Sequence, residues 1–340
     1  MYRFRVVWFT AFLCGRLICC GDEALQTVPL ELVGRSFQAA DSLHIGDESS
    51  QDALACLNGL TWSPSSFLIK CNAPDSLRGD VTVRFPSPID TGDPLNDLVS
   101  MEWYVARDEQ KRPKRAGAVV VVHETSSSMA VGRMFAHGFQ HCGFHAFLIH
   151  LPHYGKRRVD GQKPDDAFFF SAMRQAIADV RRARDAVASL PVVDADCISL
   201  QGTSLGGFVS ATAASIDNGY DNVFITLAGG NLLDVIQNGA KDAAKVRVRL
   251  ERAGLVGDQL RSLVHQIEPT RIAHRLDSDR TWIYSATLDT VVPMSSANAL
   301  ATAAKLDSSH HIKLLANHYS GIIYLPAIID QMRNQIESTK

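Results

Sequence analysis

The 340-residue chain lacks the charge pattern of a protein that binds nucleic acid. Its formal net charge is −2 at pH 7, and no basic stripe or basic patch interleaved with aromatic residues occurs along it. The short basic run "KRPKR" (111–115) contains a proline and is expected to be a solvated loop. We therefore expect no nucleic acid partner.

The chain also lacks an apolar run of the length that a membrane span requires. "VVWFTAFLCG" (6–15) holds ten residues, whereas a spanning helix needs about 20. The basic residues Arg3 and Arg5 precede this run, and this order resembles a secretory signal peptide. We expect residues 1–21 to be a signal peptide and the protein to be exported, to the periplasm or beyond. The alternative is a buried N-terminal helix in a cytoplasmic protein.

Cysteine is scarce, with four residues beyond position 21: Cys56, Cys71, Cys142 and Cys197. In an oxidising compartment Cys56 and Cys71 could close a loop, but four cysteines allow three pairings. Four free buried thiols are the alternative, and the sequence leaves both open. Internal repeats are absent as well, which argues against a solenoid or propeller.

What the chain does have is an alternation of strands and helices from residue 80 onward. Residues 22–79 are rich in Ser, Asp and Gly, and we expect them to form an irregular N-terminal extension. Strands are predicted over 80–85, 99–106, 117–123, 145–150, 197–202, 222–229, 281–287 and 311–316, and helices over 129–142, 165–190, 206–216, 295–304 and 321–338. This order predicts an α/β domain over 80–340, with a mainly parallel sheet covered by helices on both faces. The helical stretch 232–275 is an insert that either caps a pocket or pads the sheet.

One turn between a predicted strand and a predicted helix carries a reactive residue type. "LQGTSLGGF" (200–208) contains a G-x-S-x-G pattern centred on Ser204. Such a turn exposes the serine hydroxyl at the carboxyl edge of the sheet, and the following amide, Leu205, lies at a helix N-terminus that favours negative charge. The alternative is an ordinary glycine-rich turn with a capping serine.

A serine nucleophile needs a base and a group that orients the base. Asp289 follows the strand 281–287 and His318 follows the strand 311–316, so both are expected at the same edge as Ser204. His310 and His311 are competing bases, but they lie at the amino end of the strand 311–316, opposite the expected site. Asp234, after the strand 222–229, is the alternative acid.

The motif Gly202–Gly206, Asp289 with the Val-Val-Pro that follows it, His318 and the loop "HLPHYGKR" (150–157) resemble the α/β-hydrolase superfamily over about 80–338. The resemblance implies a serine hydrolase in which Ser204 is the nucleophile, His318 the base and Asp289 the orienting acid.

The resemblance also implies an oxyanion hole. One amide would come from Leu205 and the other from "HETSSSM" (123–129), where Thr125 is the expected donor with Ser126 behind it. This loop lacks the His-Gly-Gly of many lipases and esterases and is closer to the dienelactone hydrolase branch. That branch uses cysteine at the position of Ser204, so the branch does not fix the substrate. Glu124 is expected to be a solvated loop carboxylate, with contact to Ser204 as the alternative.

Five histidines fall within "HGFQHCGFHAFLIHLPHYG" (137–155) and raise the alternative of a metal site. The predicted helix over 129–142 descends from the active edge, so His137, His141 and His145 should lie far from Ser204. His150 and His153 should return to the active side, with His153 either at the pocket mouth or on the surface. We therefore expect no metal site there.

These observations predict a serine hydrolase that cleaves carboxylic esters of small molecules without a cofactor. A peptidase on the same fold and a non-catalytic binding protein are the alternatives. The sequence gives no indication of the oligomeric state.

Overall fold

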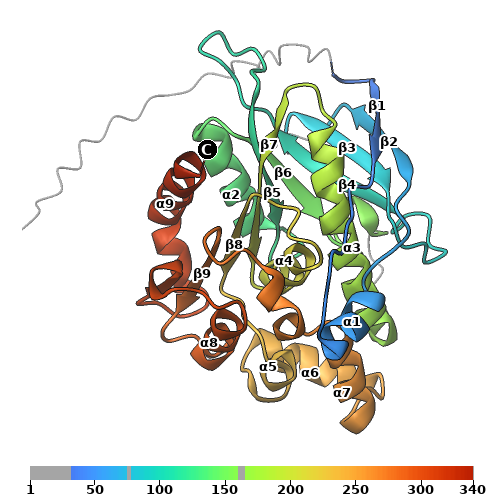
Figure 1. Ribbon diagram of the computed structural model, residues 1–340, viewed down its shortest axis with the longest axis vertical. Coiled ribbons are helices and arrows are strands. Elements are labelled where there is room, and N and C mark those ends of the chain that lie inside the picture. The colour runs from blue at the N-terminus through green and yellow to red at the C-terminus, as the bar shows by residue number, and fades with distance from the viewer. Residues whose placement is uncertain (1–31, 75–77, 160–164, 340) are drawn as a thin grey trace, which may run out of the picture.

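The computed structural model describes residues 32–74, 78–159 and 165–339. The predicted signal peptide, residues 1–21, lies outside these residues. A ten-stranded sheet runs through the molecule in the order β1-β2-β3-β4-β6-β5-β7-β8-β9-β10 (Figure 1). The strands are β1 (Ser36–Ala40), β2 (Ser66–Asn72), β3 (Val81–Pro86), β4 (Leu98–Tyr104), β5 (Ala116–Val122), β6 (His145–His150), β7 (Val193–Thr203), β8 (Asn222–Thr226), β9 (Thr281–Ala286) and β10 (His311–Leu314).

Strands β5 to β10 pair in parallel, and β1 to β4 extend the sheet in antiparallel fashion. The continuous run "AGAVVVV" of β5 is buried along nearly its whole length, as a strand covered on both faces must be. The prediction of a mainly parallel α/β sheet is confirmed.

Helices cover both faces of this sheet (Figure 1). One face packs against α2 (Ala130–His141) and α9 (Leu325–Ser338), and the other against α3 (Phe169–Ala188), α4 (Leu205–Ser215) and α8 (Met294–Ala303). The insert between β8 and β9 contains α5 (Leu232–Asn238), α6 (Asp242–Arg252) and α7 (Gly257–Gln266). Among the described residues, no helix is both long enough and apolar enough to cross a membrane.

The N-terminal extension differs from the irregular segment that we expected. Its described part contributes β1, β2 and α1 (Gln51–Asn58), and β1 and β2 form the outer edge of the sheet. In β2 the side chains of Phe67, Ile69 and Cys71 alternate inward, so half of the strand packs into the core. The Ser-, Asp- and Gly-rich composition of residues 22–79 had obscured this alternation of buried and exposed side chains.

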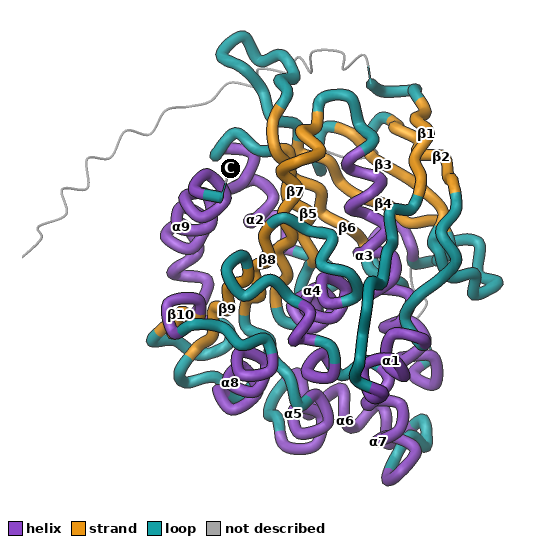
Figure 2. The backbone as a smooth tube through the Cα atoms, viewed as in Figure 1, coloured by secondary structure: helices purple, strands orange, loops and turns teal. Residues whose placement is uncertain are grey.

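A buried ion pair and two hydrogen bonds attach this extension to α3, along which the connection from β1 to α1 runs (Figure 2). Arg182 binds the Asp41 carboxylate with an Nε–Oδ1 distance of 2.8 Å. Asp185 accepts hydrogen bonds from the backbone amide and the hydroxyl of Ser42, at 2.8 and 2.6 Å. These contacts join positions more than 140 residues apart.

Cys56 and Cys71 are buried free thiols, and Cys142 is free as well. The structure therefore does not contain the Cys56–Cys71 disulfide that we considered. Burial raises the pKa of both thiols to about 11, so they stay protonated at neutral pH and behave as small core residues.

Candidate active site

Ser204 occupies the tight turn between β7 and α4. Its backbone has φ 53° and ψ −115°, an unusual conformation for a non-glycine residue, and its amide donates to the Thr226 carbonyl at 2.8 Å. The flanking glycines permit this turn. A Cβ on Gly202 would lie 2.3 Å from the Gly206 carbonyl oxygen, and a Cβ on Gly206 would lie 2.2 Å from the Val122 carbonyl oxygen. The sequence therefore presents the serine on a strained turn that only glycine neighbours allow.

Ser204, His318 and Asp289 form a continuous hydrogen-bonded row at the carboxyl edge of the sheet. Ser204 Oγ lies 3.0 Å from His318 Nε2, and His318 Nδ1 lies 2.6 Å from Asp289 Oδ2. The side chains of His318 and Asp289 are only 9% and 2% exposed, so water hardly reaches the contact between them. The structure thus places Ser204 in one row with Asp289 and His318, although these two residues lie 85 or more positions after it in the sequence.

The Asp289 carboxylate is itself held in place. Its Oδ1 accepts hydrogen bonds from the amides of Val291 and Val292, at 2.8 and 3.0 Å. Oδ2 remains for His318 Nδ1, which must carry the proton in order to donate to a carboxylate. The neutral ring then presents an unprotonated Nε2 to the serine hydroxyl.

The competing residues lie elsewhere. His310 Nδ1 donates to the Thr281 carbonyl at 2.9 Å, at the opposite end of β9, and His311 Nε2 lies 2.8 Å from Ser285 Oγ. Asp234 accepts a hydrogen bond from Asn238 within α5. None of the three belongs to the row that contains Ser204.

The two expected oxyanion-hole residues line one cavity next to Ser204. Leu205 is the first residue of α4, so its amide is among the four that find no partner within the helix. Thr125 lies in the loop after β5. The buried ring of His123 positions that loop, because its Nδ1 donates to the Glu124 carbonyl at 2.7 Å and its Nε2 accepts from the Leu151 amide at 3.2 Å. Burial lowers the pKa of His123 to about 3, which keeps the ring neutral and able to accept.

Glu124 is not the solvated carboxylate that we expected, nor does it contact Ser204. Its half-buried carboxylate accepts from the amides of Val131 and Gly132, at 3.1 and 3.0 Å. Helix α2 has no capping side chain at its N-cap residue Met129, so Glu124 satisfies the free amides of its first turn. The residue therefore fixes the start of α2 relative to the loop that carries Thr125.

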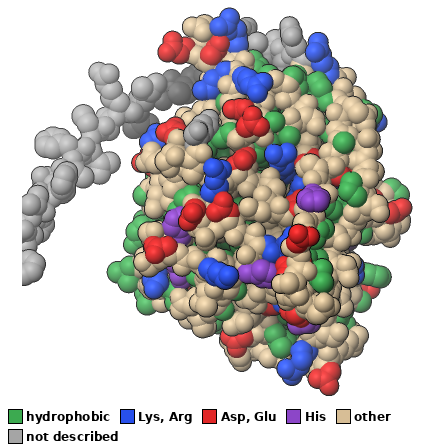
Figure 3. Space-filling model, viewed as in Figure 1, with side chains coloured by type: hydrophobic (Ala, Val, Ile, Leu, Met, Phe, Trp, Pro, Cys, Tyr) green, Lys and Arg blue, Asp and Glu red, His purple; other side chains and the backbone are tan. Residues whose placement is uncertain are grey.

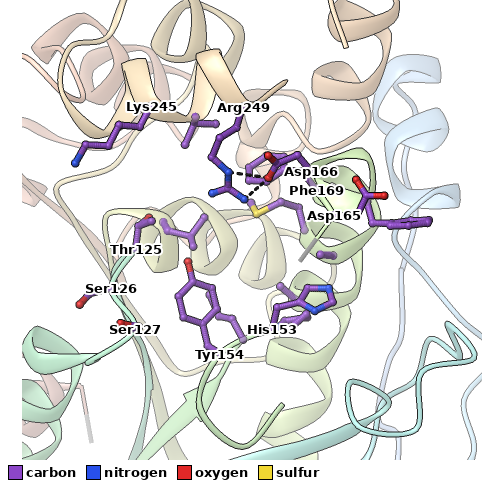
Figure 4. Close-up of a pocket in the computed structure, with 18 of the residues that line it drawn as sticks. Thr125, Ser126, Ser127, His153, Tyr154, Asp165, Asp166, Phe169, Lys245 and Arg249 are labelled. Carbon is purple, nitrogen blue, oxygen red and sulfur yellow. Dashed lines mark hydrogen bonds and ion pairs between the residues drawn. The ribbon is translucent and has the colours of Figure 1, made fainter. Parts of the chain in front are cut away.

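The cavity beside Leu205 and Thr125 has a volume of about 920 Å³ (Figure 4). One wall is apolar and comes from the start of α3 and the segment before it, with Phe168, Phe169, Ala172, Met173 and Ala176. The loop after β6 contributes Leu151, Pro152, His153 and Tyr154. His153 thus lines the pocket, which was one of its two expected positions.

A buried arginine holds this loop against α3. Arg157 forms an ion pair with Asp179 at 2.8 Å, both side chains being fully buried, and donates to the His150 carbonyl at 3.1 Å. A pair of this kind fixes geometry, and removing one partner would leave an uncompensated buried charge. The buried ion pair therefore fixes the loop that carries His153 and Tyr154 relative to α3.

Helix α6 of the insert covers the cavity from the other side, through Ala244, Val246 and Val248 among others. Arg249 of α6 binds Asp166, just before α3, with an Nε–Oδ1 distance of 2.7 Å. This part of the insert therefore lines one side of the pocket.

The histidines of the run 137–153 do not converge on one site. His145 accepts from Trp103 Nε1 and the Ala106 amide at the start of β6, and His150 Nε2 lies 3.1 Å from Glu102 Oε1. His141 Nδ1 contacts the His137 carbonyl on α2. Among the described residues, no group of three or more His, Cys, Asp or Glu side chains is arranged to hold a metal ion.

Neither a protein family model nor a curated protein matches the sequence. Solved structures do match. An acetyl xylan esterase from Paenibacillus sp. R4 is 16% identical, with a TM-score of 0.59, over 87% of this chain and 96% of that one. The α/β hydrolase GrgF from Penicillium sp. sh18 is 15% identical, with a TM-score of 0.54, over 76% and 98%. A puromycin-hydrolysing peptidase from Mycobacterium tuberculosis is 12% identical, with a TM-score of 0.56, over 80% and 46%.

Proposed function

Because the chain has the α/β-hydrolase fold, we propose that it is a serine hydrolase that cleaves carboxylic ester bonds through an acyl-serine intermediate. The observation that carries the proposal is the hydrogen-bonded row of Ser204, His318 and Asp289 beside a covered cavity. Ser204 is the nucleophile, His318 the general base and then acid, and Asp289 the residue that orients the imidazole. Small-molecule esters are the substrate class.

In the acylation step the Ser204 hydroxyl proton moves to His318 Nε2 while Oγ attacks the ester carbonyl carbon. The carbonyl oxygen becomes an oxyanion, and the amides of Leu205 and Thr125 donate hydrogen bonds to it. His318 is then doubly protonated, and the Asp289 carboxylate stabilises its positive charge at Nδ1. Collapse of the tetrahedral intermediate breaks the bond to the alcohol, which leaves with the proton from Nε2.

Deacylation repeats these steps with water. His318 Nε2 takes a proton from a water molecule, whose oxygen attacks the acyl-serine carbonyl carbon. Collapse releases the carboxylic acid and returns the proton to Ser204 Oγ, so the enzyme is regenerated and one ester has become one acid and one alcohol. No cofactor takes part in either step.

Labelling with a fluorophosphonate, followed by mass spectrometry, tests the assignment of the nucleophile. The wild-type protein is expected to gain one adduct on Ser204, and Ser204→Ala should gain none and lose about 10⁴- to 10⁶-fold in kcat. Ser210→Ala is a matched control on the same helix, because the buried Ser210 hydroxyl makes no hydrogen bond within the described part of the chain. Folded wild-type protein without an adduct on Ser204 would overturn the proposal.

Kinetics separate the proposed activity from its alternatives. His318→Ala should lose activity on the same scale as Ser204→Ala, and retention of most activity would mean that another base serves Ser204. Faster cleavage of peptide amides than of matched esters would indicate a peptidase. An adduct on Ser204 without turnover of any ester or amide would indicate a binding protein.

A further inference from the structure

Helix α6 presents its basic residues to the pocket. Lys245, Arg249 and Arg252 follow one another at intervals of four and three, so they share one face of α6 within about 60° of arc, and Lys241 is the N-cap residue just before the helix. All four line the cavity. Arg247, on the opposite face, instead donates to backbone carbonyls of α5 and of the residues that follow it. Figure 4 shows Lys245 and Arg249 extending from α6 toward the cavity, above Thr125 and Tyr154.

Positive charge exceeds negative charge around this cavity. Among the described residues, five cationic side chains line it, three from α6, Lys241 just before α6 and Arg158 from the loop after β6, against two carboxylates, Asp165 and Asp166. The excess is three positive charges. On the face shown in Figure 3, by contrast, acidic and basic side chains are interspersed. The concave wall of the pocket strengthens the local potential of these cations.

Internal partners use only part of this charge. Asp166 neutralises Arg249, while the Lys245–Asp242 pair at 2.7 Å is largely exposed and weak. Lys241 lies over the Tyr319 ring at 4.8 Å. Within the described residues, Arg158 and Arg252 have no ion pair or hydrogen bond. These two guanidinium groups are available to a ligand.

The opposite wall of the cavity is apolar. Phe169, Ala172, Met173 and Ala176 follow a helical spacing at the start of α3, and Phe168 precedes them with 60% of its surface exposed. A ligand that fills the cavity therefore meets hydrocarbon on one side and unpaired cations on the other. Thr125 and Leu205, the residue that directly follows Ser204, also line this cavity.

We propose that the preferred substrates are anionic esters, which carry a carboxylate or a phosphate several bonds away from the scissile ester. The apolar part of the substrate packs on α3, and its anionic group binds beneath α6, between Arg158 and Arg252. This inference rests on the proposed esterase function and adds the substrate class. The net charge of the whole chain, −2, does not predict a preference for anionic substrates.

The test uses two matched substrate pairs, because the anion could belong to the acyl or to the alcohol portion. The first pair is 4-nitrophenyl hydrogen adipate and 4-nitrophenyl hexanoate, and the second is 4-acetoxybenzoate and its methyl ester. In each pair the selectivity is kcat/KM for the anionic ester divided by kcat/KM for the neutral ester. Comparing this ratio between protein variants cancels the intrinsic reactivity of the substrates.

The double variant Arg158→Gln/Arg252→Gln should lower the selectivity for at least one pair by about 3- to 30-fold, because two exposed charges at the pocket are removed. The kcat/KM for the neutral ester is measured as well, so that a general loss of activity is distinguished from a loss of selectivity. The matched control is Arg261→Gln on α7, which removes one exposed charge from the same insert at a residue that does not line the cavity. It should leave both values unchanged.

Salt provides a second measurement that needs no variant. Raising the NaCl concentration to about 0.5 M should lower the wild-type selectivity, because salt screens the exposed cations. Unchanged selectivity in the double variant, or in the single variants if the double variant does not fold, overturns the inference about anionic substrates. Ser204-dependent hydrolysis of neutral esters would then leave the proposed function standing. Absence of any Ser204-dependent ester hydrolysis overturns both.

Discussion

Replacing Gly206 by alanine should damage catalysis more than stability. The added Cβ would lie 2.2 Å from the Val122 carbonyl oxygen and 2.6 Å from the His123 carbonyl oxygen, whereas ordinary contacts of this kind exceed 3.4 Å. The end of β5 and the start of α4 must therefore separate by about 1 Å. His123 is two residues before Thr125, so the same shift moves the loop that we propose as half of the oxyanion hole.

The expected magnitudes follow from that displacement. Overpacking of a buried site costs about 1 to 3 kcal/mol of unfolding free energy. A misplacement of 1 Å at a reaction centre costs about 10²-fold in rate. Loss of a contact made only in the transition state lowers kcat and kcat/KM equally, so KM for a neutral ester should stay close to the wild-type value.

The assay combines steady-state kinetics on a neutral ester with urea unfolding of the same preparation. Gly59→Ala is the matched control, because the Cβ added there would lie 3.4 Å from the Cys56 carbonyl oxygen and Gly59 has a φ of −83°. That variant should keep wild-type kinetics. Folded Gly206→Ala with kcat within threefold of wild type would show that the close approach of α4 to β5 does not set the geometry of the site.

Two further predictions concern protonation. Asp289→Asn should lower kcat by about 10³- to 10⁴-fold with little change in stability. The introduced asparagine side chain can keep the bonds to the amides of Val291 and Val292, but it then presents its NH₂ group to His318 Nδ1 and so forces the ring proton onto Nε2. Kinetics at pH 8 test this, and near-wild-type kcat would show that His318 needs no carboxylate. Acid should destabilise the fold from about pH 6.5 downward. Burial lowers the pKa of His123 to about 3 and of His145 to about 4, so below pH 6.5 these rings bind protons in the unfolded chain but stay unprotonated in the native state. Each ring should cost about 2 kcal/mol of unfolding free energy at pH 5 relative to pH 7.5; urea unfolding at the two pH values measures the difference, and equal stability at both would contradict the buried neutral state.

Most of the sheet could be predicted from sequence because its strands carry their own signal. β5 is a run of buried β-branched residues, and the helices between the parallel strands have clear boundaries. β2 carried a signal as well, the alternation of Phe67, Ile69 and Cys71, but the exposed Leu68 between them obscured it. β1, "SFQAA", carries almost none, and it forms because its backbone pairs with β2. Such a strand depends on its neighbour more than on its own residues.

The three residues of the proposed catalytic row could be predicted because each follows a strand of known direction, and parallel strands bring their carboxyl ends to one edge. The role of Glu124 could not, because its partners are backbone amides of the next helix. The basic spacing on α6 was readable in the sequence. That this face meets the start of α3 across a cavity depends on packing between segments about 80 residues apart, and nothing local encodes it.

The attachment of the N-terminal edge to α3 also bears on how the chain folds during synthesis. Asp41 and Ser42 leave the ribosome about 140 residues before their partners on α3, an interval of roughly 7 to 30 s at 5 to 20 residues per second. Strands β1 to β4 can form a local meander in that time, yet the pairs that anchor its outer edge do not exist until Arg182 and Asp185 emerge. A nascent chain released before that point keeps an unanchored edge strand, which is a template for pairing with other chains.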